Sequence, residues 1–305
     1  MSTVLRSALS YKSTEHLEPG AHTVTLHGVD LHYQVSGNGP LLFIVSPGWG
    51  IGSGYLQRGF RFLQDHFRVV FVDTRGSGLS GRPSDATKMS SHDMADDLDA
   101  LREHLGLAFL RLLGHANSGA IVLSYAERYP DCVERMILVD SQVLGFTAAN
   151  DTQSFLQERA EHPHYKTAIR TALRGFSGQI DFGASDESLT AFMAKILPLY
   201  LQRPEKNLNF ALEQLAGRMA SYAYRAQAAA DQTAGVDQTT LLDQIRASVL
   251  IISGRHDWIC PVAVAERLHQ GILNSRLLVF EESGHMPWLE EPARFAAEVI
   301  QFLET

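Results

Sequence analysis

Three turns in the sequence carry residue types that support nucleophilic and proton-transfer chemistry. The first, Gly114–Gly119 (GHANSG), follows an apolar run and precedes a helical pattern, a setting in which a sharp turn exposes one side chain above a sheet. The others, Ser253–Asp257 (SGRHD) and Glu282–Trp288 (ESGHMPW), each follow an apolar run. A carboxylate can orient an imidazole, and the imidazole can move protons. Asp257 in the second turn and His285 in the third have these side-chain types.

These turns are connected by short apolar runs that alternate with helical patterns. Near-continuous runs of Val, Ile, Leu and Phe are typical of strands covered on both faces, as in a parallel sheet. Strand alternating with helix predicts an α/β fold, with a mostly parallel, eight-stranded sheet flanked by helices. The predicted strands are Thr23–Leu26, Leu31–Val35, Leu41–Val45, Val69–Val72, Leu110–Leu113, Met136–Val139, Val249–Ile252 and Leu277–Phe280, of which the first two form a hairpin.

The alternation stops between residues 144 and 240, where the sequence has no convincing strand pattern. Helical stretches are predicted there around Thr152–Glu161, Lys166–Gly175, Glu187–Leu197, Leu208–Ala220 and Tyr222–Ala230. A helical block inserted between two sheet strands predicts a lid rather than a second independent domain. We therefore expect a body from residues 1–143 and 241–305 and a helical lid from residues 144–240.

Composition limits the partners and the compartment. The chain of 305 residues carries 26 Lys and Arg against 34 Asp and Glu, a formal net charge of −8, with no dense basic run. That balance argues against nucleic acid or an anionic membrane surface as the main partner. Cys132 and Cys260 cannot make a disulfide framework, and the sequence shows no secretory signal and no apolar stretch of membrane-spanning length. We expect a cytoplasmic protein whose partner is a small-molecule substrate.

Around the first turn the chain resembles the α/β-hydrolase superfamily, in the branch that holds proline iminopeptidase-like and esterase-like members with a helical lid. There a strand runs into Gly-His-Ser-x-Gly-Gly, and Gly114–Gly119 is similar except that Ala116 stands at the nucleophile position. A methyl group cannot attack a carbonyl. The chain is then either a natural non-catalytic relative or a form with a Ser→Ala change that traps a bound ligand. The otherwise intact machinery favours the Ser→Ala change.

The same resemblance implies the other members of a catalytic triad. It makes Asp257 the acid that orients the histidine and His285 the base, in the chain order elbow, acid, histidine. Ser118 is a rival nucleophile because small residues also flank it, although it lies two residues further along, in the predicted helix. Asp140 directly follows a predicted strand and is a rival acid.

The resemblance also implies an oxyanion hole, a pair of N–H groups that stabilises developing negative charge. The residue after the nucleophile position, here Asn117, supplies one N–H group. The other comes from Ser46–Gly50 (SPGWG), where proline iminopeptidases have His-Gly-Gly-Pro-Gly, followed by the Gly-Ser-Gly-Tyr that residues 52–55 repeat. This alignment makes Gly48 the expected donor and Trp49 the next. The missing His and the Trp in place of Pro weaken the case for iminopeptidase specificity, and Trp49 is expected either to line the substrate pocket or to pack in the core.

The reaction that the resemblance implies is hydrolysis of an ester, lactone, thioester or amide bond of a moderately apolar small molecule through an acyl-enzyme. Three alternatives stay open: a non-catalytic ligand-binding relative, a non-hydrolytic enzyme that uses His285 as a base, and an epoxide hydrolase or dehalogenase with Asp at position 116. The sequence has no metal-ligand motif, and Gly76–Gly78 (GSG) is an incomplete dinucleotide loop. We expect no metal and no cofactor.

Overall fold

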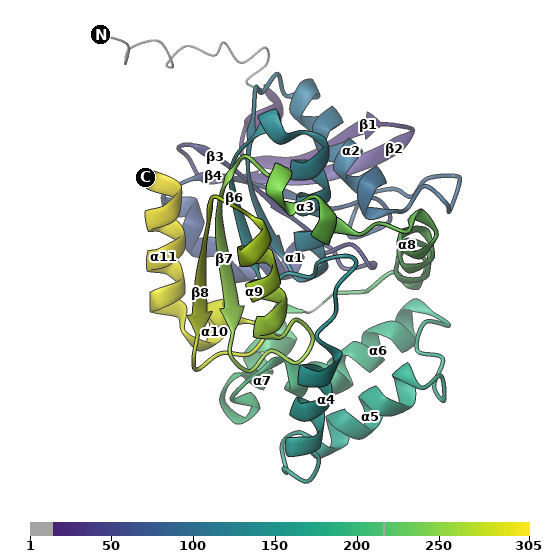
Figure 1. Cartoon of the computed structure of the whole chain (residues 1–305). Coiled ribbons are helices and arrows are strands. Elements are labelled where there is room, and N and C mark those ends of the chain that lie inside the picture. The colour runs from purple at the N-terminus through teal and green to yellow at the C-terminus, as the bar shows by residue number, and fades with distance from the viewer. Residues whose placement is uncertain (1–14, 216) are drawn as a thin grey trace.

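The computed structural model describes residues 15–215 and 217–305, so residues 1–14 of the predicted body lie outside the described part of the chain. Eight strands form one sheet in the order β1-β2-β4-β3-β5-β6-β7-β8, in which β2 runs antiparallel to both neighbours and the other pairs are parallel. This confirms the predicted fold class (Figure 1). The strands are β1 (Gly20–Leu26), β2 (Val29–Ser36), β3 (Leu41–Val45), β4 (Arg68–Val72), β5 (Leu110–His115), β6 (Val133–Val139), β7 (Ser248–Gly254) and β8 (Ser275–Phe280).

Helices cover both faces of the sheet, which explains the continuous apolar runs. The helices are α1 (Gly54–Gly59), α2 (Ser91–His104), α3 (Asn117–Arg128), α4 (Ala149–Glu158), α5 (Lys166–Phe176), α6 (Asp186–Ile196), α7 (Pro204–Gln214), α8 (Ser221–Ala234), α9 (Val262–Gly271), α10 (Pro287–Glu290) and α11 (Pro292–Glu304). In β3, Phe43 and Val45 belong to a core shared with α2, α3 and α9, whereas Leu42 and Ile44 belong to a core shared with α1, α10 and α11. Because successive strand side chains point to opposite faces, both alternate sets must be apolar.

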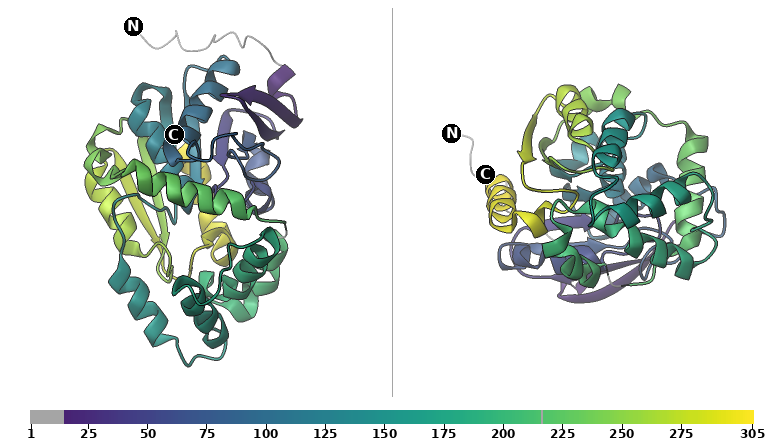
Figure 2. Two further views of the ribbon diagram at one scale, coloured as in Figure 1. Left: turned by 90° about the vertical axis from the view of Figure 1, so that its right-hand side faces the viewer. Right: turned by 90° about the horizontal axis from the view of Figure 1, so that it is seen from below.

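The segment from residue 144 to 240 holds α4 to α8 and, among its described residues, no strand. In Figure 1, α4 to α7 lie beyond the carboxyl ends of β7 and β8; α4, α5 and α6 share a small core that includes Phe155, Ile169 and Phe192. The left view of Figure 2 shows α8 running across the molecule above these helices. Ala223 and Ala230 of α8 belong to the core that contains α2 and α3. Helix α8 thus packs against the body. The predicted lid boundaries at residues 144 and 240 stay a prediction.

Two predicted helices are displaced along the chain. Helix α4 spans Ala149–Glu158 instead of Thr152–Glu161. Helix α7 spans Pro204–Gln214 instead of Leu208–Ala220, a range that also includes residue 216, outside the described residues. Proline favours the first turn of a helix, where its missing N–H group would have no partner, and Gly217 disfavours helix beyond Gln214.

Within the described residues, every helix is too short or too polar to cross a bilayer.

Helix α3, which follows the turn at Ala116, carries a carboxyl group that is poorly accommodated. Both oxygens of Glu127 are buried and have no hydrogen-bond partner among the described residues. Burial, with a smaller contribution from the charge of Asp237, raises the pKa of Glu127 from 4.5 to about 8. Between these two values the unfolded chain loses a proton that the folded chain keeps, so this group makes the protein less stable as pH rises.

Replacing Glu127 with glutamine should therefore stabilise the protein only at high pH. We expect the free energy of unfolding to rise by about 1–2 kcal/mol at pH 8.5 and to stay nearly unchanged at pH 4, where both states of the parent are protonated. Urea unfolding at the two pH values measures this, with the exposed Glu213→Gln of α7 as the control. An equal gain at both pH values would contradict the assignment.

Candidate active site

Ala116 lies in a strained turn between β5 and α3. Its φ is 56° and its ψ −125°, and a positive φ is uncommon for a residue with a Cβ atom. The turn is held because the Ala116 N–H donates to the Val139 carbonyl (3.1 Å) and the Gln142 N–H donates to the Ala116 carbonyl (3.0 Å). Ala116 keeps part of its surface accessible, whereas its chain neighbours on both sides are buried. This is the backbone geometry of a nucleophile elbow, with residue 116 at its tip.

Ser118, the rival nucleophile, is engaged in the turn itself. Its side chain is completely buried, and its hydroxyl donates to the His115 carbonyl (2.9 Å) and accepts from the His115 N–H (2.7 Å). An attack on a substrate would break both hydrogen bonds. The geometry therefore favours residue 116 as the nucleophile position and gives Ser118 a role in stabilising the turn.

His285 and Asp257 form a buried hydrogen-bonded pair. The His285 Nδ1 lies 2.7 Å from the Asp257 Oδ2, and the two residues are 2% and 3% exposed. The Asp257 Oδ1 accepts the N–H groups of Ile259 (2.9 Å) and Cys260 (3.1 Å), so the carboxylate has three donors. With Nδ1 donating to Asp257, Nε2 is the basic nitrogen, and it makes no hydrogen bond to any of the described residues. This imidazole is arranged to accept a proton at Nε2.

The loops that carry this pair are fixed by close backbone contacts. A Cβ atom on Gly254 would lie 1.9 Å from the Gly284 carbonyl oxygen, so only glycine allows this approach. The His285 N–H donates to the carbonyl of Tyr200 (2.8 Å), which ends the short 3₁₀ helix Leu197–Tyr200. The predicted lid segment therefore contacts the candidate base directly.

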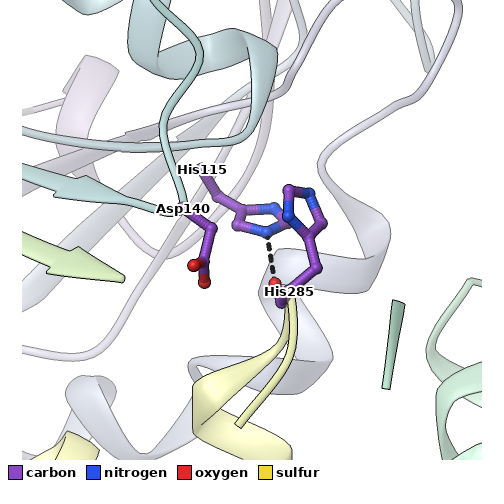
Figure 3. A group of neighbouring side chains, drawn as sticks. All are labelled: His115, Asp140 and His285. Carbon is purple, nitrogen blue, oxygen red and sulfur yellow. Dashed lines mark hydrogen bonds between the residues drawn. The ribbon is translucent and has the colours of Figure 1, made fainter. Parts of the chain in front are cut away.

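His115 contributes to the site although the sequence analysis did not single it out. Its ring lies against that of His285, with centroids 4.5 Å apart, and its Nε2 lies 2.9 Å from the His285 carbonyl oxygen (Figure 3). The Tyr55 hydroxyl lies 2.7 Å from the His115 Nδ1. Burial raises the pKa of Tyr55, and burial together with the neighbouring His285 holds the pKa of His115 well below its usual value. His115 is thus neutral: it accepts a hydrogen bond from the Tyr55 hydroxyl and donates one to the His285 carbonyl. The sequence signal that could have indicated this contact is the Gly-Ser-Gly-Tyr stretch, which contains Tyr55.

Two buried groups of side chains have the composition of a metal site. The first group is His115, Asp140 and His285, each of which has one nitrogen or oxygen atom within 4.8 Å of the others (Figure 3). The second group is Asp257, Cys260 and His285, whose potential ligand atoms lie within the same distance of one another. Both ring nitrogens of His115 already have protein partners, and burial raises the pKa of the Cys260 thiol, which disfavours the thiolate that binds metals. We interpret both groups as parts of one hydrogen-bonded network.

The predicted oxyanion-hole residues lie beside the turn at Ala116. Asn117 is the first residue of α3, so its N–H group has no acceptor within the helix, and its side-chain amide donates to the Pro47 carbonyl (2.6 Å). The Trp49 N–H donates to the Gln227 Oε1 of α8 (2.8 Å). Proline iminopeptidases have a proline at that position, and here Gln227 accepts from the additional N–H group. This contact favours Gly48 over Trp49 as the second donor.

Gln227 should stabilise the fold through this hydrogen bond. Its side chain is completely buried, so Gln227→Leu leaves the N–H of Trp49 without an acceptor. We expect the free energy of unfolding to fall by about 1–3 kcal/mol in urea titrations. Gln232→Leu, at an exposed position of the same helix, should change it by less than about 0.5 kcal/mol. Equal effects of the two substitutions would show that the contact with Trp49 adds nothing.

The fold is that of the α/β-hydrolases, and the sequence agrees. The profile of the alpha/beta hydrolase fold family matches residues 42–292, and the chain belongs to this family. The chain is 26% identical over 288 residues to the AB hydrolase superfamily protein YclE of Bacillus subtilis, covering 91% of the chain and 96% of YclE. It is 25% identical over 275 residues to a pimeloyl-[acyl-carrier protein] methyl ester esterase of Vibrio vulnificus, covering 90% and 98%.

Solved structures show the same fold. A thermophilic esterase from Thermogutta terrifontis superposes with a TM-score of 0.71 at 22% sequence identity, covering 93% of this chain and 98% of the esterase. The predicted superfamily is therefore confirmed, and the relatives include esterases.

Proposed function

We propose that this chain is built to hydrolyse an ester, lactone, thioester or amide bond of a moderately apolar small molecule through a Ser-His-Asp triad. The observation that carries the proposal is the accessible, positive-φ position 116 in a site that also holds the His285–Asp257 hydrogen bond of 2.7 Å. Esterases among the relatives support acyl transfer. With Ala116, the chain binds its substrate and turns it over very slowly, because the attacking oxygen is missing.

Each group then has a defined task in the form with serine at position 116. The His285 Nε2 takes the proton from the hydroxyl as its oxygen attacks the carbonyl, and Asp257 stabilises the imidazolium. The N–H groups of Gly48 and Asn117 stabilise the oxyanion. His285 returns the proton to the leaving group, and a water activated by the same nitrogen then hydrolyses the acyl-enzyme.

Aromatic side chains support an apolar or aromatic substrate. The ring of His285 contacts that of Tyr200, with centroids 5.1 Å apart. The ring of Tyr224 contacts those of Trp49 (5.9 Å between centroids) and Phe182 (5.5 Å). All four of these aromatic residues keep accessible surface, as apolar ligands require. Two surface cavities of about 370 and 690 Å³ are lined by other residues, with none of the three triad positions among them. The ring contacts of His285 with Tyr200 and of Trp49 with Tyr224 are the basis on which we assign the substrate to these aromatic side chains.

Ala116 itself favours a second candidate, a ligand-binding relative in which alanine is the native residue. The two functions differ in their response to a nucleophile. A binding protein keeps its ligand affinity and gains no turnover when serine is introduced, whereas a hydrolase gains turnover.

The test is a substrate panel with the Ala116→Ser protein. Aryl esters, lactones, thioesters and amino-acid amides are screened beside the parent, and Ala116→Asp is screened on epoxides and haloalkanes. We expect turnover of at least one acyl class by Ala116→Ser only. Binding of these compounds without turnover would support the ligand-binding candidate, and activity of Ala116→Asp alone would support displacement chemistry.

A further inference from the structure

Glu290 is a half-buried carboxylate, outside the proposed triad, that connects the loop of His285 to the predicted lid. It is the last residue of the short helix α10. Its two oxygens accept four N–H donors, which are the backbone N–H groups of Gly284 (2.7 Å), Gln202 (3.0 Å) and Arg203 (2.9 Å) and the side-chain amide of Asn207 (3.2 Å). Four donors on one carboxylate make this a strongly held group, because hydrogen bonds to a charged acceptor are stronger than neutral ones.

The donors come from two segments that are far apart in the sequence. Gly284 directly precedes His285, whereas Gln202 and Arg203 follow the 3₁₀ helix Leu197–Tyr200 in the predicted lid. One oxygen, Oε2, accepts the N–H groups of both Gly284 and Gln202. If either segment moved away from the other, one of these partly buried N–H groups would lose its acceptor, which is unfavourable.

The two segments also touch through their backbones. A Cβ atom on Gly284 would lie 2.7 Å from the Tyr200 carbonyl oxygen, so glycine is needed for this close approach. On the other side, the buried Tyr165 hydroxyl lies 3.0 Å from the Leu201 carbonyl oxygen and 2.8 Å from that of Gln202. The chain from residue 200 to 203 is thus held between the start of α5 and the loop of His285.

The next residue, Glu291, offers a contrast within the same loop. Its Oε2 accepts the Glu282 N–H (3.0 Å) and the Ser283 hydroxyl (2.8 Å), both of which belong to the loop itself. None of the hydrogen bonds found for Glu291 among the described residues reaches the predicted lid. Glu291 therefore anchors the loop locally, whereas Glu290 also ties it to another segment.

We propose that Glu290 is a positioning residue that fixes the imidazole of His285 relative to Tyr200. The rings of these two residues are in contact, with centroids 5.1 Å apart, and Tyr200 is one of the aromatic side chains to which the substrate is assigned. Without the carboxylate, the Gly284 N–H loses its acceptor one residue before the base, and the imidazole shifts relative to a bound substrate. A misplacement of about 1 Å costs about 10²-fold in rate. This inference rests on the proposed function, because it concerns the histidine of the proposed triad.

The first measurement does not depend on catalysis. In the parent chain with Ala116, proton NMR follows the low-field resonance of the His285 Nδ1–H that is hydrogen-bonded to Asp257, assigned by its absence in His285→Ala. We expect this resonance to be lost to exchange with water in Glu290→Ala and to persist in Glu291→Ala. If Glu290→Ala does not fold by circular dichroism, Glu290→Gln takes its place. An unchanged resonance in the folded variant, or an equal loss in Glu291→Ala, would overturn the proposal.

The second measurement separates kcat from KM for ester hydrolysis in the Ala116→Ser background. We expect Glu290→Ala to lose about 10–100-fold in kcat, because the base is misplaced. KM should stay within about twofold, because ground-state binding does not use the imidazole and Tyr165 still holds residues 201 and 202. Glu291→Ala should lose at most about threefold in kcat, and the exposed Glu266→Gln should leave both constants unchanged.

Two outcomes of these kinetics would overturn the proposal. One is an equal loss of kcat in Glu290→Ala and Glu291→Ala, which would show that a local anchor of the loop is sufficient. The other is a rise in KM at unchanged kcat, which would place Glu290 in substrate binding instead. An inactive Ala116→Ser parent would refute the proposed function and leave the NMR result to decide the role of Glu290.

Discussion

Replacing Ala116 with serine should raise the rate of hydrolysis of a responsive ester by a factor of roughly 10⁴–10⁶ over the parent. Under the proposed function the parent lacks the attacking oxygen but keeps the His285–Asp257 hydrogen bond and the Asn117 N–H group at the start of α3. Substrate affinity should change little, because binding in the ground state does not require the hydroxyl. Single-turnover kinetics and calorimetric binding measure the two quantities separately.

A serine placed elsewhere provides the matched control. Ala149 lies exposed at the start of α4, so Ala149→Ser adds the same hydroxyl away from the turn and should leave the rate at the parent level. Equal rates for Ala116→Ser and the parent would show that residue 116 is not the nucleophile.

In the Ala116→Ser protein, His285→Ala should cost about as much as losing the serine, again roughly 10⁴–10⁶ in kcat. The hydroxyl and the imidazole act as one unit, because an alcohol that keeps its proton is a poor nucleophile. Asp257→Asn should cost less, since it leaves the imidazole in place. The exposed His269→Ala serves as the control and should retain full activity. A His285→Ala protein that kept more than about a tenth of the rate would remove this residue from the mechanism.

The fold could be predicted from the sequence because its signals are local. Both faces of the sheet are covered by helices, so strands such as β3 consist entirely of apolar residues and are visible without knowledge of their partners. The exact position of α7 was not predicted, because apolar residues recur at helical spacing beyond Gln214, although the described residues 215 and 217–220 are not helical. Local propensity decides such boundaries only weakly.

The site could be predicted only where its residues lie in family-like turns. Ala116, Asp257 and His285 were proposed as site residues in that way, and their roles stay a prediction. The partners of the site were not, because their roles arise from contacts between distant segments: Tyr55 with His115, and Gln227 with Trp49, which are separated by 178 positions. No spacing rule in the sequence indicates such pairs.

The most direct test of the central claim is covalent labelling of the Ala116→Ser protein with an organophosphonate ester, followed by mass spectrometric mapping. The hydroxyl oxygen at position 116 should attack the phosphorus and displace the aryloxide or alkoxide group of the ester, because His285 accepts the hydroxyl proton and can pass it to the leaving group. We expect one label per chain at position 116, no label on the parent, and strongly slowed labelling when His285 is replaced by alanine. Labelling at Ser118, or equal labelling with and without His285, would contradict the account.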